Sequence, residues 1–140
     1  MRKFEFRLQK VLEYRLLVEG WAKDAYLEAQ QKLLEAEKTL QTMGDRHQTA
    51  LVLKPATIDE IVVNEAFLQR LEDEMDMQRS LIGILDSGVE SARLTWLEKR
   101  REAETLQNMR DEAHAEYTLE VNRFEQAEAD EWAVLRRKAA

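Results

Sequence analysis

Residues 22–36 read AKDAYLEAQQKLLEA and contain the clearest indication of the fold. Alanine, tyrosine and leucine recur in it at alternating intervals of four and three residues, which is the spacing of a coiled-coil seam. The same spacing extends from Leu8 to Ala50, where ten of the thirteen seam positions are apolar. The three polar exceptions are Arg15, Glu19 and His47. One helix cannot bury such a stripe alone, so the pattern predicts a second helix packed against the first.

The seam stops at residues 53–57, which read LKPAT. Pro55 disfavours helical geometry at Lys54 and has no backbone N–H to donate. Thr57 and Glu60 have the spacing of a capping box, which predicts a new helix start. The 4-3 spacing then resumes and continues toward the C-terminus. The sequence therefore predicts a first helix over about 4–53, a turn over 54–57 and a second helix over about 58–138.

A short connection makes two helices antiparallel neighbours. The predicted fold is all-α, with two long helices forming an antiparallel coiled-coil hairpin in one domain of residues 1–140. The second helix is longer, so its C-terminal part should overhang with an uncovered apolar seam. Each glycine inside a helix costs about 1 kcal/mol relative to alanine, so a bend or local break fits at 83–88, around Gly83 and Gly88. The expected overhang seam includes Leu106, Ala113, Tyr117 and Phe124.

Composition excludes several classes of protein. The 140 residues include 28 acidic and 21 basic side chains, for a net charge of −7, which argues against a nucleic-acid partner. Four glycines and one proline are too few for the turns of an all-β or α/β fold. The absence of cysteine excludes a disulfide and a thiolate zinc site. No apolar run is long enough to span a membrane, so we expect a soluble, unprocessed chain without membrane insertion.

Catalytic motifs are weak throughout. Residues 111–114 read DEAH, a helicase box, but the Gly-rich phosphate loop that would accompany it is missing. His47 and His114 are the two histidines, and they fall on different helices, so no metal site is expected. We therefore predict no enzyme activity and no cofactor. Trp96 falls on the seam and should pack in the core, whereas Trp21 and Trp132 fall off it and are candidate contact residues.

Both ends of the chain carry a family resemblance. Residues 4–15 read FEFRLQKVLEYR, which resembles the F-x-F-R-L-Q-x-V-L-x-x-R start of the FliJ family of bacterial flagellar type III export proteins. Near the C-terminus the chain is similar to that family's terminal pattern at Leu106-Gln107, Glu116-Tyr117, Glu125-Gln126, Asp130-Glu131 and Arg136. The resemblance covers nearly the whole chain, although the middle third matches mainly as a coiled coil.

The resemblance implies a non-enzymatic component of the export apparatus. It implies a coiled coil similar to the axle formed by the gamma subunit of rotary ATP synthases. Such a protein docks in the hexameric flagellar export ATPase, promotes its assembly and activity, and links it to the cytoplasmic part of the membrane export gate. Export chaperones are further implied partners. The implied location is cytoplasmic and peripheral, at the inner face of the cell membrane at the flagellar base.

The resemblance also implies site residues. Residues 67–72 read FLQRLE and match the family's F-[IL]-Q-x-L-E stretch, which implies export-gate contacts at Phe67 and Leu71, with Met43 facing them from the first helix. The N-terminal end of the chain and the C-terminal part of the second helix, which we call the paired ends, supply the implied ATPase contacts. These are Phe6, Arg7, Leu8, Gln9, Tyr117, Asp130 and Glu131.

Two other functions are compatible with the sequence. The chain could be a free export chaperone or chaperone escort that binds client helices through the exposed C-terminal seam. It could also be the equivalent stalk protein of a virulence secretion system, although the F-x-F-R-L-Q start favours the flagellar version. Weak self-association through the same overhang seam is a further expectation.

Overall fold

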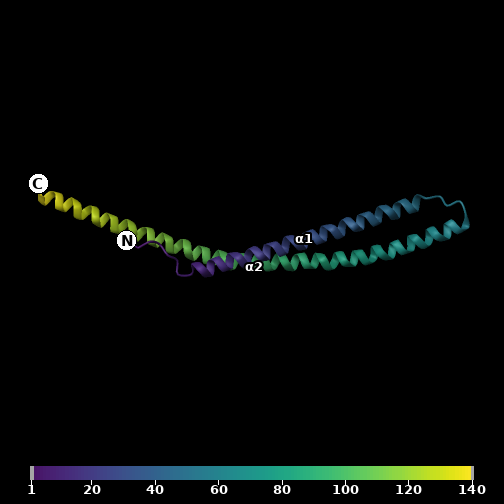
Figure 1. The fold of residues 1–140 in the computed structure, drawn as a ribbon, viewed down its shortest axis with the longest axis horizontal. Helices are drawn as coiled ribbons and strands as arrows, with labels where there is room; N and C mark the ends of the chain where they lie inside the picture. Colours follow the sequence, from purple (N-terminus) through teal and green to yellow (C-terminus); the bar gives the residue numbers. More distant parts are fainter. Residues whose placement is uncertain (1, 140) are drawn as a thin grey trace. The chain divides into compact units, whose positions relative to one another are not determined.

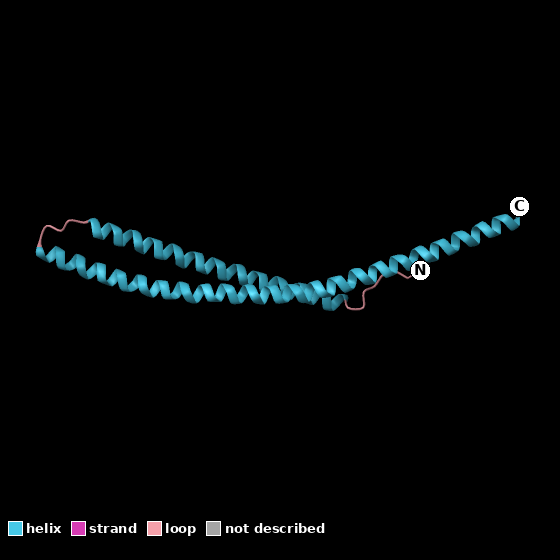
Figure 2. Cartoon of the chain, turned by 180° about the vertical axis from the view of Figure 1, so that it is seen from behind, coloured by secondary structure: helices cyan, strands magenta, loops and turns pink. Residues whose placement is uncertain are grey.

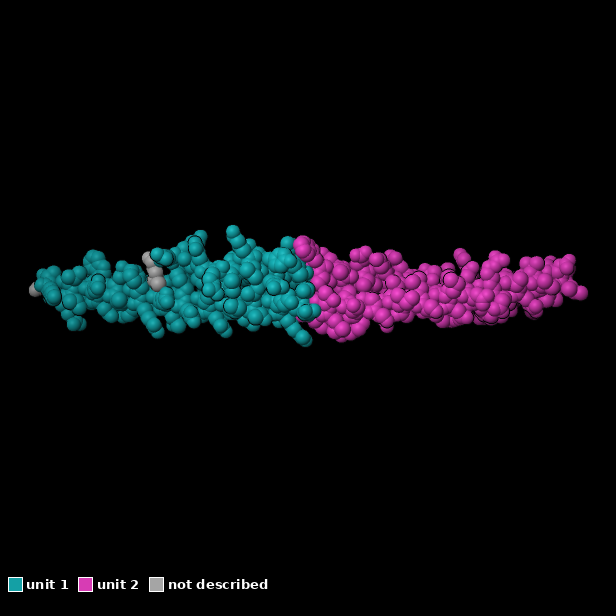
Figure 3. Space-filling view, turned by 90° about the horizontal axis from the view of Figure 1, so that it is seen from below, with its two compact units in different colours: residues 1–20, 98–140 teal, residues 21–97 magenta. Residues whose placement is uncertain are grey.

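The computed structural model describes residues 2–139 as two long helices. Helix α1 spans Gln9–Val52, helix α2 spans Ile58–Ala139, and a short connection joins them (Figures 1 and 2). The described residues contain no strand. The predicted fold class, an all-α pair of long helices packed against each other, is confirmed. The chain divides into two compact units, unit 1 with Met1–Gly20 and Glu98–Ala140, and unit 2 with Trp21–Leu97 (Figure 3).

Burial within each unit follows the predicted seam. In unit 2, every seam position of α1 from Ala22 to Ala50 is at least partly buried, and so is every seam position of α2 from Asn64 to Trp96. The most buried apolar side chains of unit 2 are Ala36, Ala50 and Leu71. In unit 1 they are Leu12 and Ala103. The three alanines among these residues let the two helix backbones approach closely.

Polar seam residues fix the register of unit 2. The Asn64 side-chain amide donates to the Ala50 carbonyl at 3.2 Å, and the Gln78 amide donates to the Ala36 carbonyl at 2.9 Å. Both the donors and the acceptors are two heptads apart, so one pairing register satisfies both bonds. His47 Nε2 also lies 3.0 Å from a carboxylate oxygen of Glu72. A slip of one heptad would separate His47 from Glu72 and would remove the small alanines from the positions where the two amides reach the α1 backbone, which favours a single register.

The start of α2 has one hydrogen bond of the predicted capping box, and the return bond from Glu60 goes to Ala56 instead of Thr57. The Glu60 N–H donates to Thr57 Oγ1 at 3.2 Å, and the Ala56 N–H donates to Glu60 Oε2 at 2.7 Å. Farther along, α2 runs without a break through Gly83 and Gly88, and neither glycine has a positive φ. The local break expected at 83–88 is therefore not present.

The predicted start of the first helix near residue 4 is wrong, because α1 begins at Gln9. Residues 2–8 are non-helical, and we call them the N-terminal strap. Over residues 2–6, partly buried Phe4 and Phe6 alternate with exposed side chains, which is the period-two pattern of extended chain. Residues 7–8 form a turn, and Leu8 is also partly buried. A helical start would place Glu5 on the seam, whereas the strap turns three apolar side chains inward. The Gln9 N–H donates to the Phe6 carbonyl at 3.1 Å, where the strap turns into the helix.

The uncovered part of α2 is shorter than expected. Leu106, Ala113 and Tyr117 were expected on an exposed overhang seam, but all three are partly buried within unit 1. After Val121 every described residue of α2 is exposed, and Phe124 is 47% exposed. The difference has two causes. Helix α1 itself reaches as far as Arg110, which is beyond Leu106. The strap then continues along α2 beside Ala113 and Tyr117, as Figure 1 shows.

Candidate functional site

An aromatic cluster holds the strap against α2 in unit 1. The Phe4 ring packs edge-on against His114, with centroids 4.9 Å apart, and lies 5.5 Å from the Tyr117 ring. The Arg110 guanidinium lies 5.6 Å from the Phe4 centroid, within cation–π range. The Tyr117 hydroxyl donates to the Arg2 carbonyl at 2.6 Å. These contacts place the strap over one face of α2.

Polar contacts join the two helices beside this cluster. Arg110 Nε donates to Gln9 Oε1 at 3.0 Å, and Arg15 Nη1 donates to Glu102 Oε2 at 2.8 Å. Lys99 adds a weaker ion pair to Glu102 at 3.8 Å. Three charged seam residues therefore have partners, although their partial exposure limits what each pair contributes to stability.

The structure brings five of the seven expected ATPase contacts together. Phe6, Leu8, Gln9 and Tyr117 are partly buried at the paired end of unit 1, and Arg7 is exposed there. Phe6, Arg7 and Gln9 line an open groove of about 570 Å³ with Arg110. The last two expected contacts, Asp130 and Glu131, are exposed on the uncovered part of α2. At about 1.5 Å per residue they lie roughly 20 Å beyond Tyr117.

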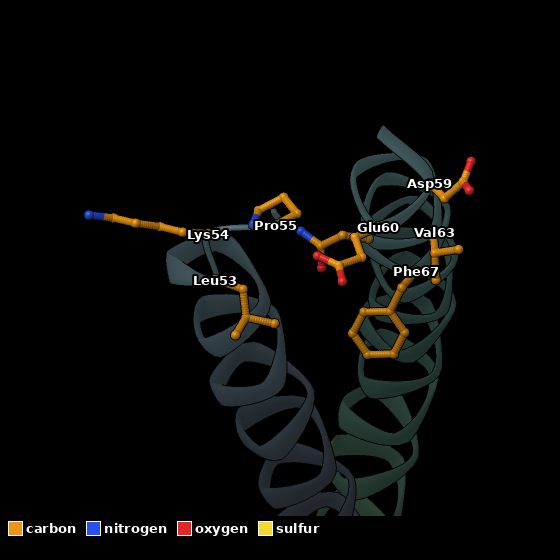
Figure 4. A pocket seen from close by; sticks show the side chains of 8 residues that line it. Leu53, Lys54, Pro55, Asp59, Glu60, Val63 and Phe67 are labelled. Carbon is orange, nitrogen blue, oxygen red and sulfur yellow. The ribbon is translucent and has the colours of Figure 1, made fainter. Parts of the chain in front are cut away.

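The turn end of unit 2 carries an apolar groove beside Phe67. This groove has a volume of about 660 Å³, and its lining includes Leu53, Pro55, Val63 and Phe67. Figure 4 shows Leu53 and Phe67 on the two sides of the groove, with Glu60 at its rim. Phe67 is 43% exposed, so its ring can contact another molecule.

The three expected gate contacts do not form one surface. Leu71 is only 4% exposed, which places it in the core of unit 2. Met43 is partly buried, and its neighbour Gly44 faces the Met75 side chain. That position is about two helical turns along α2 from Phe67. Phe67 lines a second groove with residues of α1 that extend from Thr42 to Leu53, and Met43 is not in its lining. The pairing of Asn64 with Ala50 places Met43, one heptad earlier on α1, level with Leu71, one heptad later on α2. The expectation that Met43 faces Phe67 and Leu71 as a gate contact stays a prediction.

One family of known proteins matches the chain. The sequence model described as "Flagellar FliJ protein" matches residues 4–139, which is almost the entire chain. The chain belongs to the FliJ family. No curated protein and no solved structure matches it. Membership makes this FliJ chain a flagellar export protein, and it supports the resemblance drawn from the two ends of the sequence.

Sequence reasoning missed part of the site of this FliJ chain. The motif over residues 4–15 includes Phe4 but predicts a helix there, and His114 stands out in the sequence only within the DEAH stretch and as a histidine that could bind a metal. The alternation of apolar and charged residues over 3–8 is the signal that could have found the strap. Nothing in the sequence placed Arg110 against Phe4, because that contact depends on the register of the two helices.

The remaining features of the FliJ chain lie away from these residues. Trp96 stacks on Tyr26 with centroids 5.6 Å apart, as its seam position predicted, while Trp21 and Trp132 are exposed. Hydrogen bonds from Arg93 lower the pKa of the Glu90 carboxyl. Within residues 2–139 no His, Cys, Asp and Glu side chains gather in a group that could hold a metal ion. Neither described helix combines the length and apolarity needed to cross a membrane.

Proposed function

We propose that this chain is a non-enzymatic adaptor of the flagellar export apparatus. It docks in the hexameric export ATPase, promotes assembly and turnover of that ATPase, and links it to the export gate at the cytoplasmic face of the membrane. In this role the paired helices act like the axle of a rotary ATP synthase. The observation that carries the proposal is the family match over residues 4–139. The packing of two long helices supports it.

The paired end of unit 1 is the proposed ATPase contact. Arg7 is exposed beside the groove that Phe6 and Gln9 line, so its guanidinium is free to reach a carboxylate of the ATPase. Gln9 already accepts a hydrogen bond from Arg110, so its side chain supports the packing of this end. Asp130 and Glu131 offer acidic contacts farther along α2. Basic residues outnumber acidic ones by five to two in the first fifteen positions, which would steer this end toward an acidic surface.

The turn end of unit 2 is the proposed gate contact. Phe67 is its central residue, because the ring is exposed and borders two grooves. Aromatic side chains next to apolar pockets are frequent hot spots of protein interfaces. Leu71 supports this contact from the core by holding the two helices together. Met43 has a packing role farther from the turn.

A chaperone function is the second candidate, and the uncovered part of α2 favours it. Five apolar side chains between residues 118 and 139 are more than 45% exposed: Leu119, Phe124, Trp132, Val134 and Leu135. Exposed apolar side chains along one helix are suited to packing against another helix. Client helices of export chaperones would bind here, away from Phe67.

Site-specific photo-crosslinking tests where each partner binds. We expect a crosslinking residue at position 7 to capture the purified export ATPase and one at position 67 to capture the cytoplasmic part of the gate. Position 77 is the control, because Met77 is 74% exposed on α2 but is part of neither surface. Capture of the ATPase from position 67 instead of position 7 would contradict the proposal that the ATPase binds the paired end of unit 1 and the gate binds the turn end of unit 2. Capture of a chaperone client from position 124, with no ATPase captured from position 7, would favour the second candidate.

A further inference from the structure

We propose that the N-terminal strap is an autoinhibitory cover, and that its release opens the seam of α2 in unit 1 to an amphipathic helix with basic flanking residues. The strap occupies the place that a helix would take if α1 continued along α2. It covers Ala113 and Tyr117, which are seam residues of α2 by the 4-3 spacing.

No seam residue under the strap is as buried as the best-covered seam residues of unit 1, where the two helices pair. Where α1 lies against α2 in unit 1, Leu12 is 2% exposed and Ala103 is 3% exposed. Under the strap, Ala113 and Tyr117 are only partly buried. A helix presents an apolar side chain at every turn and fills the holes of the facing seam, which an extended segment cannot do. A partner helix would therefore bury more apolar surface here than the strap does.

The contacts that hold the strap can be released at low cost. The bond between the Tyr117 hydroxyl and the Arg2 carbonyl is exposed to solvent, and Phe4 and Phe6 remain partly exposed. None of the strap residues is among the fully buried core residues. Segments with few buried apolar contacts and solvent-exposed hydrogen bonds open before the rest of a fold does.

The seam beyond the strap indicates what would replace it. Val121 and Phe124 continue the stripe of Ala113 and Tyr117 at helical spacing, but the seven residues of the strap reach only its first part. Residues 118–135 carry five acidic side chains and one basic one. A helix that lies along this stretch would need lysine or arginine beside its apolar face. The occupant is therefore an amphipathic helix with basic flanks.

A peptide-binding experiment on the full chain tests the proposal. The probe is a helical peptide of about three heptads with leucine at positions a and d and lysine at positions e and g. A matched peptide carries glutamate at e and g. We expect the variant Phe4→Ala/Phe6→Ala to bind the lysine peptide about tenfold more tightly than the wild type, because it no longer has to displace the strap. The glutamate peptide should bind neither protein.

Two further variants keep the test independent of folding defects. Tyr117→Phe removes only the hydroxyl that bonds to Arg2, so it should increase binding of the lysine peptide by a smaller factor. Lys3 and Glu116 line the same surface hollow, and the chain has no cysteine. A short bismaleimide linker between cysteines in the variant Lys3→Cys/Glu116→Cys should therefore lock the strap and weaken peptide binding relative to the unlinked form.

Three outcomes would overturn the proposal. These are equal affinity of the wild type and Phe4→Ala/Phe6→Ala for the lysine peptide, no effect of the crosslink, or equally tight binding of the glutamate peptide. Circular dichroism would verify that each variant keeps its helix content. The assay contains no ATPase and no gate protein, so its failure would leave the proposed function untouched.

Discussion

Replacing Leu71 with aspartate is expected to lower the free energy of unfolding by about 2–5 kcal/mol. Leu71 is 4% exposed in the core of unit 2, so the substitution removes a buried apolar side chain and puts a carboxylate in its place. Urea denaturation followed by circular dichroism at 222 nm, a wavelength that reports helix content, would measure the change.

Ile84→Asp is the matched control for this stability measurement. Ile84 is on α2 in the same unit but is 69% exposed, so its replacement should change the free energy of unfolding by less than about 0.5 kcal/mol. Similar losses in the two variants would contradict the assignment of Leu71 to the core. They would also show that the seam does not determine the stability of unit 2.

Replacing Phe67 with aspartate should leave the stability of the chain nearly unchanged and weaken its binding to the export gate. Phe67 is 43% exposed at the apolar groove. The urea midpoint of the variant should therefore shift no more than surface substitutions usually shift it. Its affinity for the cytoplasmic part of the export gate should fall about 30-fold or more, which is the effect expected at an interface hot spot. Isothermal titration calorimetry with the purified gate domain would measure it.

Met77→Asp provides the control for the binding experiment. Met77 is more exposed than Phe67, at 74%, but lies away from the groove, so its replacement should leave gate affinity unchanged. Equal affinity of the wild type and Phe67→Asp would rule out Phe67 as the central gate contact. Together, the Leu71 and Phe67 variants separate a residue that holds the helices together from one that contacts a partner.

The seam could be predicted from the sequence because its signal is repeated many times. In both helices the 4-3 spacing identifies the buried face, down to polar positions such as Asn64 and Gln78. Pro55 and the capping box of Thr57 and Glu60 likewise give strong local signals for the turn. The 4-3 spacing does not mark the start of α1, because Phe4 and Leu8 are also one helical turn apart; only the alternation of apolar and charged residues over 3–8 favours the strap. Packing of Phe4 on α2 favours the extended form.

The roles of individual site residues depend on register, which the sequence alone left open. The 4-3 spacing places Leu71 on the seam and Phe67 off it, whereas the family resemblance implies the same gate role for both. In the structure, Leu71 is enclosed between the helices while Phe67 lies beside the groove. The register also brings Arg110 and His114 to Phe4. A single sequence contains no direct signal for contacts between residues so far apart in the chain.

The rate of ATP hydrolysis by the cognate export ATPase, measured with and without the chain, tests whether the chain promotes the activity of that ATPase. The wild type should raise the rate and promote hexamer assembly, and Arg7→Ala should weaken both effects. Arg70→Ala, which removes an exposed arginine of unit 2, should stimulate as well as the wild type. Absence of stimulation and of any effect on assembly by the wild type would contradict the proposed function. Equal stimulation by Arg7→Ala would contradict the placement of the ATPase contact at the paired end of unit 1.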